Sequence, residues 1–305
     1  MDKVKILIAG GTGLIGGRLV ELLNKSKYHI CILSRRDLTS TDNVTYYKWN
    51  PDQLEMDEDA LKGTSVIVNL AGAGIADKKW SAERKKLILS SRVNSCKTIN
   101  KYVAMLAQTP KLYFGASAVG IYGHRGNEIL ETTSAIGSGF LADVTEAWEK
   151  EHASLANLVE RNIILRIGIV LSKKGGALKE ILKTAPLGVY GYFGNGKAYY
   201  PWIHIDDICK IIIDSFNDTN LSGVYNGTAP NPVTIKELVT AAKNANSGMG
   251  VLMPVPKFGL KIAMGEMADM LFNSTRAIPS RLQKAGFKFL FEDIDLAMKS
   301  LLGKT

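Results

Sequence analysis

The chain has 305 residues, of which 46% are hydrophobic and 22% charged, a composition typical of a globular protein with a sizeable core. Its net charge of +9 comes from scattered lysines and arginines without a basic stripe, so a nucleic-acid partner is not expected and an anionic small molecule is favoured. No run approaches about 18 apolar residues and the first residues lack the features of a signal peptide, which argues against a membrane span and predicts a cytoplasmic protein.

The first predicted strand, residues 4–10, runs into a cluster of glycines that opens a helix predicted over residues 14–24. The cluster fits both G-x-G-x-x-G from Gly11 and G-x-x-G-x-x-G from Gly10. Glycine allows a tight turn and leaves room for a pyrophosphate, which the free N–H groups and positive dipole end of the helix attract. We therefore predict a dinucleotide-binding loop that uses Gly10, Thr12, Gly13, Leu14, Ile15 and Gly16.

The second predicted strand, residues 29–35, ends in a Ser-Arg-Arg sequence. A site for NAD places an Asp or Glu at this point, where the carboxylate accepts a hydrogen bond from the ribose 2′-OH. Ser34, Arg35 and Arg36 instead offer a hydroxyl and two guanidinium groups, which suit a 2′-phosphate. The sequence therefore predicts NADP(H) as the cofactor.

The third and fourth predicted strands cover residues 44–49 and 65–72. Trp49, at the end of the third strand, is interpreted either as a stacking surface for adenine or as a core residue. The fourth strand ends in small residues that leave room for the ribose on the nicotinamide side: Leu70, Ala71 and Gly72.

The fifth predicted strand, residues 111–117, places Ser117 at its carboxyl end. Open α/β sheets bind their ligands at this edge, so Ser117 is predicted both to contact the cofactor and to take part in catalysis. Tyr122 follows five residues later and has two interpretations, a substitute catalytic acid or a packing tyrosine.

Helices predicted over residues 80–108 and 139–157 alternate with these strands, and a sixth strand is predicted over residues 162–171. Such alternation is typical of a parallel sheet covered by helices on both faces. We therefore predict an α/β protein with a doubly wound parallel sheet, a Rossmann fold.

The composition changes after residue 171, where a glycine-rich aromatic segment is followed by helical patterns. We predict an NADP-binding domain over residues 1–171, to which residues of about 200–228 return, and a smaller, mainly helical substrate-side region over residues 172–305. No metal site is expected, because the cysteines lack metal-ligand spacing: Cys31, Cys96 and Cys209.

Several motifs carry a family resemblance across essentially the whole chain. They are GGTGLIG, VNLAGAGI, GASAVGIYG, WIHIDD and the C-terminal GEMADML. Together they resemble the extended short-chain dehydrogenase/reductase superfamily, and within it an atypical epimerase-family branch, cell-division-inhibitor-like, with a characteristic C-terminal extension. The resemblance implies an NADP(H)-binding Rossmann fold, a small-molecule substrate and a homodimer. It also implies that Arg92, in the long helix after VNLAG, lines the substrate and cofactor cleft and contacts the cofactor.

One feature of that superfamily is missing from this chain. Its active members carry a Tyr-x-x-x-Lys pair on the helix after the fifth strand, where the tyrosine is the acid or base and the lysine lowers its pKa. Neither Phe140 with Val144 nor Leu141 with Thr145 supplies that pair. Two hypotheses follow. The first is an NADP(H)-dependent, epimerase-like oxidoreductase in which Ser117 donates a hydrogen bond to a substrate oxygen. The second is a non-catalytic NADP(H)-dependent sensor or regulatory protein.

Overall fold

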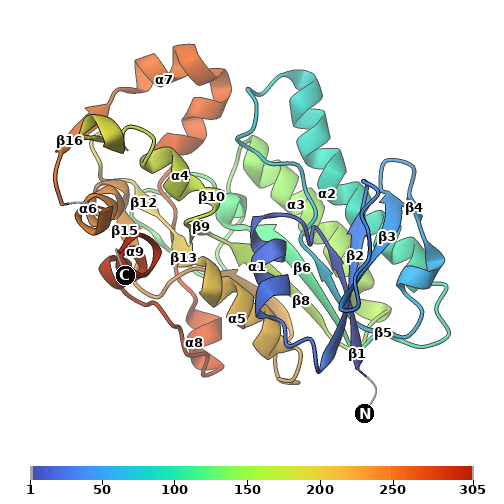
Figure 1. Cartoon of the computed structure of the whole chain (residues 1–305). Coiled ribbons are helices and arrows are strands. Elements are labelled where there is room, and N and C mark those ends of the chain that lie inside the picture. The colour runs from blue at the N-terminus through green and yellow to red at the C-terminus, as the bar shows by residue number, and fades with distance from the viewer. Residues whose placement is uncertain (1–2, 247, 304–305) are drawn as a thin grey trace.

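A large, mainly parallel sheet forms the centre of the computed structural model, which describes residues 3–246 and 248–303 (Figure 1). Within those residues the sheet has eight strands in the order β14-β8-β6-β5-β1-β2-β3-β4, and only β3 and β4 pair antiparallel. The strands are β1 (Val4–Ala9), β2 (Tyr28–Ser34), β3 (Val44–Asn50), β4 (Glu55–Met56), β5 (Thr64–Asn69), β6 (Leu112–Ala118), β8 (Asn162–Ile167) and β14 (Gly223–Gly227). The predicted doubly wound α/β fold is confirmed.

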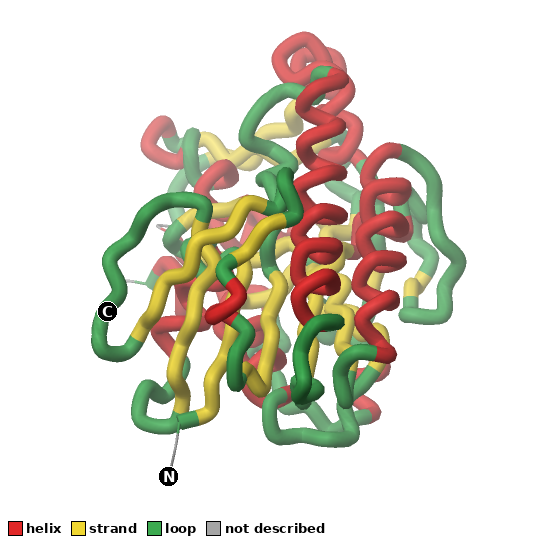
Figure 2. The backbone as a smooth tube through the Cα atoms, turned by 90° about the vertical axis from the view of Figure 1, so that its right-hand side faces the viewer, coloured by secondary structure: helices red, strands yellow, loops and turns green. Residues whose placement is uncertain are grey.

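Helices cover both faces of the sheet because side chains of each strand alternate between two cores. Ile6 and Ile8 of β1 pack in a cluster with residues of α1 (Leu14–Leu22) and α5 (Ile205–Ser215). Leu7 packs in another cluster with residues of α2 (Ala82–Val103). Helix α3 (Phe140–Ala153) contacts α2, and Figure 2 shows two long helices side by side on one face of the sheet. The alternating pattern of the strands therefore fixes where each helix packs.

The strand order reverses at β1, which has β2 on one side and β5 on the other. Ligands of open α/β sheets bind at the carboxyl ends of the strands that flank such a reversal. The loops after β1 and β5 meet there, where the Leu70 N–H donates to the Ala9 carbonyl at 2.9 Å. Gly10 has φ +82°, and a Cβ on it would lie 2.8 Å from the Leu70 carbonyl carbon. The topology thus brings two predicted cofactor-binding segments together.

Short strands as well as helices build the substrate-side region. Its helices are α4 (Ala177–Ile181), α6 (Ile235–Asn246), α7 (Lys257–Met264), α8 (Ser280–Lys284) and α9 (Ile294–Leu302), and the 3₁₀ helix η5 spans Gly265–Phe272. The remaining strands are β7 (Ile129–Leu130), β9 (Ile169–Ser172), β10 (Gly175–Gly176), β11 (Val189–Phe193), β12 (Tyr199–Tyr200), β13 (Trp202–His204), β15 (Val233–Thr234), β16 (Val251–Val255) and β17 (Arg276–Ala277). The expectation of a mainly helical region missed these strand pairs, such as β11 with β16.

The predicted strand over residues 162–171 divides into β8 and β9 at Gly168. The Gly168 N–H donates to the Gly227 carbonyl at 3.0 Å, whereas the next N–H, of Ile169, donates to the Pro201 carbonyl at 2.6 Å. The chain therefore leaves the large sheet here and enters a small sheet with β13. Later in the chain, β14 returns to the large sheet and pairs with β8.

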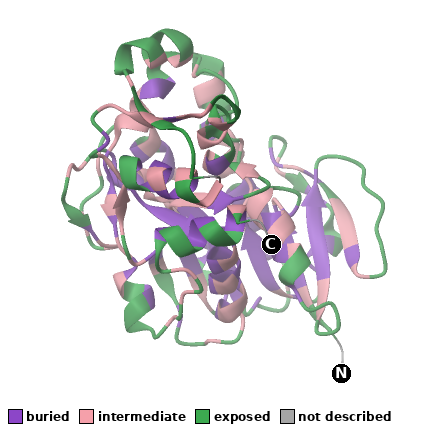
Figure 3. Ribbon diagram, turned by 60° about the vertical axis from the view of Figure 1, so that its left-hand side comes forward, coloured by how far each residue is buried: buried purple, intermediate pink, exposed green. Residues whose placement is uncertain are grey.

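Burial follows these layers, since Figure 3 shows the strands of the large sheet as mostly buried. Helix α7 has no buried residue and lies at the periphery. None of the helices in the described ranges is both long enough and apolar enough to cross a membrane.

His152 of α3 lies fully buried beneath β6. Its Nε2 is 2.8 Å from the Ala116 carbonyl oxygen, which can only accept, so Nε2 carries the hydrogen and Nδ1 accepts from the Tyr113 hydroxyl at 2.8 Å. Burial lowers the pKa of His152 from its ordinary 6.5 to about 4. The folded protein therefore contains a neutral imidazole.

This pKa difference predicts an acid-sensitive contribution to stability. Between pH 6.5 and 4 the unfolded chain binds a proton at this position and the folded chain does not, so stability falls as the pH falls. The free energy of unfolding of the wild type should drop by roughly 3 kcal/mol more than that of His152→Gln across this window. Urea unfolding at a series of pH values measures both, and parallel curves would contradict the prediction.

Candidate functional site

The glycine loop after β1 leaves the start of α1 open to an anion. Gly13 caps the helix without a side-chain hydrogen bond, and its N–H donates to the Gly10 carbonyl at 3.0 Å. The N–H groups of Leu14, Ile15 and Gly16 have no backbone or side-chain acceptor in the described ranges. Such groups at a helix N-terminus bind phosphate oxygens. Thr12 is exposed at the tip of the same loop.

The close packing of the loop explains why glycines are needed. A Cβ on Gly16 would lie 2.7 Å from the Gly11 Cα and closer still to the Gly10 carbonyl oxygen. A Cβ on Gly11 would lie 2.9 Å from the side chain of Ile32 in β2. Such close packing is a requirement of a dinucleotide-binding loop, and pyrophosphate binding at this loop stays a prediction.

At the end of β2, the Ser34 hydroxyl accepts from the Arg36 N–H at 3.1 Å and donates to the Arg36 carbonyl at 2.8 Å. This turn presents Arg35 and Arg36 to solvent, and neither has a carboxylate partner among the residues described. Asp37 is held by Lys48 instead, with Nζ 2.6 Å from Oδ1. Both guanidinium groups are thus available to a phosphate, while the Ser34 hydroxyl is engaged in the turn.

Trp49 lies in the core next to this turn. It is 6% exposed and packs in a cluster with Leu33 and Met56. The structure thus places its ring mainly among apolar side chains, in keeping with the packing interpretation. An adenine contact for Trp49 stays a prediction.

The loop after β5 is held by Asn69, which the sequence reasoning missed. The Ala71 N–H donates to the Asn69 side-chain oxygen at 3.1 Å, and the Asn69 amide donates to the Tyr113 hydroxyl at 3.1 Å. Leu70 and Ala71 are half-buried and Gly72 is exposed, so the small residues do leave the backbone accessible. The position of Asn69, a polar amide at the end of an apolar strand, is the feature of the sequence that indicates such a role.

Ser117 belongs to a buried polar network at the carboxyl end of β6. Its hydroxyl donates to Glu149 Oε1 of α3 at 2.5 Å. Arg166 of β8 donates two hydrogen bonds of 2.8 Å to the same carboxylate, from Nε to Oε1 and from Nη2 to Oε2. The side chains of Arg166 and Glu149 are 8% and 13% exposed, so this is a buried bidentate ion pair.

This network changes the expected role of Ser117. A carboxylate paired with arginine can only accept, so the Ser117 hydrogen is committed to Glu149. The lone pairs of Ser117 Oγ are left to accept a hydrogen bond from a ligand hydroxyl or amide. The predicted donation from Ser117 to a substrate oxygen would require this bond to break first.

Tyr122 is fully buried and its hydroxyl is already engaged. It donates to the Asn226 side-chain oxygen at 2.7 Å and accepts from Arg166 Nη1 at 3.0 Å. Burial raises the pKa of Tyr122. These contacts favour the packing interpretation, in which Tyr122 braces Arg166, over a catalytic acid.

The sequence did carry a signal for this network. Arg166 stands alone in an otherwise apolar strand, and an arginine in such a position needs a buried partner. Glu149 is the carboxylate of α3 that turns inward, whereas Asp143 and Glu146 are exposed. On the same helix the Thr145 hydroxyl donates to the Leu141 carbonyl at 2.7 Å and is engaged within the helix.

The side chain of Arg92 crosses the loop after β5. Its Cζ would lie 3.1 Å from a Cβ on Gly72, and its Nη1 donates to the Ala73 carbonyl at 3.0 Å and to the Ile88 carbonyl at 2.9 Å. The predicted cofactor-binding residues after β1 and β5 are therefore clustered, with Arg92 beside them.

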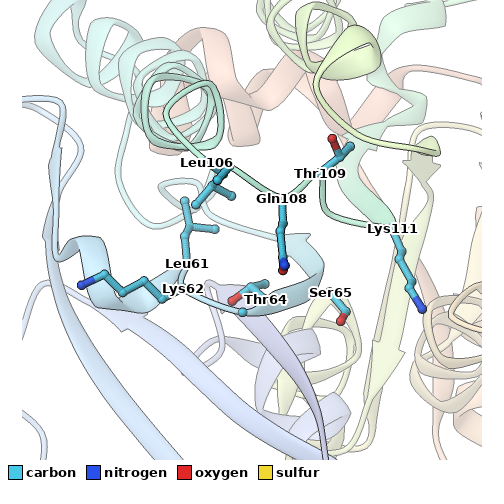
Figure 4. Close-up of a pocket in the computed structure, with 10 residues that line it drawn as sticks. Leu61, Lys62, Thr64, Ser65, Leu106, Gln108, Thr109 and Lys111 are labelled. Carbon is cyan, nitrogen blue, oxygen red and sulfur yellow. The ribbon is translucent and has the colours of Figure 1, made fainter.

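A surface hollow of about 320 Å³ lies elsewhere, and Figure 4 shows the residues around it. Thr64 and Ser65 start β5, and Lys111 directly precedes β6, so the hollow lies at the amino ends of these strands. The glycine loop and Ser117 are at the carboxyl ends. We therefore do not assign this hollow to the cofactor or substrate.

Comparison with known proteins identifies the family of the chain. Residues 6–142 match the model of the NAD dependent epimerase/dehydratase family, and residues 255–301 match a domain of unknown function, DUF1731. The epimerase family protein YfhF of Bacillus subtilis is 32% identical over 301 residues, which cover 98% of both chains. The chain belongs to the epimerase family. The predicted resemblance to an epimerase-family branch with a C-terminal extension is confirmed.

Two solved structures extend the comparison. Human epimerase family protein SDR39U1 (isoform 2), solved with NADPH, has a TM-score of 0.88 and 27% identity, and the match covers 99% of this chain and 100% of that one. UDP-glucuronic acid 4-epimerase from Bacillus cereus, solved with UDP-glucuronic acid and NAD, has a TM-score of 0.78, 15% identity and 98% coverage of both chains. At that identity the second match shows the fold alone.

Proposed function

We propose that this epimerase-family chain is an NADP(H)-dependent oxidoreductase that acts on a small molecule. The observation that carries the proposal is the Ser117 hydroxyl, which the Glu149–Arg166 pair orients at the ligand-binding edge of the sheet. The cofactor part is supported by the open N-terminus of α1, by the exposed Arg35 and Arg36, and by the NADPH in the human relative.

The bound nicotinamide would supply or accept a hydride. In the oxidative direction Ser117 Oγ would accept the hydroxyl proton of the substrate alcohol as the hydride leaves the carbon that bears it. Ser117 passes its own hydrogen to the Glu149 carboxylate at the same time, along the existing bond. The alcohol becomes a carbonyl, and reduction follows the reverse path. This relay replaces the tyrosine that α3 lacks.

Turnover tests the role of Ser117. Ser117→Ala should lower kcat by roughly 100-fold or more, because the proton relay is cut, and should leave the NADPH dissociation constant within about threefold. NADPH absorbance against a panel of carbonyl, quinone and sugar-nucleotide substrates gives kcat, and a fluorescence titration gives affinity. Unchanged turnover in Ser117→Ala would contradict the mechanism.

Cofactor choice tests Arg35. Arg35→Asp should weaken NADPH binding by roughly 10- to 100-fold, because it removes charge-assisted bonds to the 2′-phosphate, and should affect NADH binding far less. Isothermal titration with each cofactor gives the two constants. Equal losses for NADPH and NADH would rule out the assignment of NADP(H).

The absence of a Tyr/Lys pair on α3 favours one alternative, a non-catalytic sensor whose NADP(H) is a signal. That protein would bind NADPH tightly without turning over any substrate of the panel, and would capture a protein partner only when NADPH is present. Turnover that Ser117→Ala abolishes would exclude this alternative.

We further propose that the protein is cytoplasmic and forms a homodimer. Within each chain, we propose that the cofactor-binding part ends at residue 171 and the substrate-side part begins at residue 172. Multi-angle light scattering of the purified chain tests the dimer. A monomeric mass at micromolar concentration would contradict it.

A further inference from the structure

Arg92 is a half-buried cation without an anionic partner among the residues that the structure describes. Its Nη1 donates to two backbone carbonyls, those of Ala73 and Ile88, and its Cζ lies 5.1 Å from the ring centre of Trp148. No carboxylate of the described residues lies within ion-pair distance of it, and Nε and Nη2 have no protein acceptor there. Three N–H donors of a planar fork are therefore unused.

Three other arginines are paired with carboxylates. Arg166 forms an ion pair with Glu149, Arg18 with Asp206 and Arg84 with Asp77. Burial, and next the positive charge of Arg84, lower the pKa of Arg92 to about 10. Burial and the nearby positive charge disfavour the protonated form of Arg92, and a negatively charged ligand would stabilise that form by pairing with it.

The position of Arg92 relates it to the reacting centre. Its guanidinium lies between Gly72, at the end of the β5 loop, and Trp148 of α3. The residue after Trp148 is Glu149, which holds Ser117. The pyrophosphate of a dinucleotide has its own predicted partners at the start of α1. An anion at Arg92 would therefore lie beside the β5 loop, against the same helix α3 that carries the partner of Ser117.

We propose that Arg92 binds an anionic group of the substrate, a carboxylate or a phosphate, through the Nε–Nη2 edge of its guanidinium. This inference rests on the proposed function, since it names the substrate class of that same site. The planar fork matches the two oxygens of either group, and a shielded site strengthens such bonds.

Inorganic phosphate is the probe. The full chain, saturated with NADPH so that the cofactor site is filled, is titrated with phosphate at constant ionic strength, and the rise in thermal midpoint gives the dissociation constant. Arg92→Met keeps the length of the side chain and its packing on Trp148 but removes the charge. It should weaken phosphate at least about tenfold.

Two further variants sharpen the result. Gly72→Ala keeps the charge but places a Cβ 3.1 Å from the Arg92 Cζ, so the guanidinium must shift by a few tenths of an ångström, and phosphate binding should weaken by less than in Arg92→Met. Lys86→Met removes an exposed positive charge from the same helix and should leave phosphate binding within about twofold. Equal loss in Lys86→Met would mean general electrostatics and would overturn the proposal.

The NADPH constant separates the two sources of an anion. The resemblance implies a cofactor contact for Arg92, whereas the proposal expects Arg92→Met to bind NADPH within about twofold of the wild type, because the predicted partners of the cofactor phosphates are the start of α1 and Arg35 and Arg36. A tenfold loss of NADPH affinity would assign Arg92 to the cofactor, and a wild type without saturable phosphate binding would leave no anion site; either result overturns the proposal. Because these are binding measurements, their outcome is independent of whether turnover is found.

Discussion

Gly16→Ala should weaken NADPH binding by about 100-fold, or ~2.7 kcal/mol. The new methyl group would lie 2.7 Å from the Gly11 Cα and closer still to the Gly10 carbonyl, both of them backbone atoms. The loop must therefore move away from α1, and the N–H groups that would hold the pyrophosphate lose their arrangement. Fluorescence titration with NADPH measures the loss.

Gly17→Ala is the matched control for this variant. A Cβ on Gly17 would meet nothing within 4 Å, although it adds the same methyl group to the same helix one residue later. It should leave NADPH affinity unchanged and stabilise the fold by about 0.5–1 kcal/mol, because alanine is the better helix residue. If the two variants bound NADPH equally well, the glycine loop would not be the pyrophosphate site.

Glu149→Ala should lower the free energy of unfolding by about 3–5 kcal/mol. The substitution leaves the Arg166 guanidinium buried without its carboxylate and removes the acceptor of the Ser117 hydroxyl. Burying an unpaired charge is the costly part, since the pair itself contributes little net energy. Urea unfolding of the variant and the wild type gives the difference.

A double variant distinguishes the unpaired charge from lost packing. Glu149→Leu combined with Arg166→Met replaces both charges with apolar groups and should recover much of the loss. Glu180→Ala serves as the surface control, because its pair with Lys183 is about 70% exposed on each side and should contribute nothing measurable. A cost below about 1 kcal/mol for Glu149→Ala would show that Arg166 is not truly buried.

Local chemistry explains what could be predicted from the sequence. The glycine cluster, the apolar strands and the Ser-Arg-Arg turn each carry their information within a few residues. The alternation of such strands with helices predicts a doubly wound fold, and the observed strand order of the sheet confirms it. The strand order places the β5 loop beside the glycine loop, and the cofactor contact of Leu70, Ala71 and Gly72 stays a prediction.

Long-range pairing explains what could not be predicted. Glu149 and Arg166 are 17 residues apart on different elements, and the exposed Asp143 and Glu146 look equally eligible in the sequence. Strands of two residues such as β12 and β15 show no period, so the sheets of the substrate-side region were missed. The break at Gly168 depends on the approach of Pro201, which only the folded chain reveals.

The affinity of the wild-type chain for NADPH, compared with NADH under identical conditions, bears most directly on the proposed cofactor site. The open helix terminus and the exposed Arg35 and Arg36, which have no carboxylate partner in the described part of the chain, predict saturable binding of both cofactors, with NADPH at least about tenfold tighter. Equal affinities, or no binding of NADPH, would contradict that assignment.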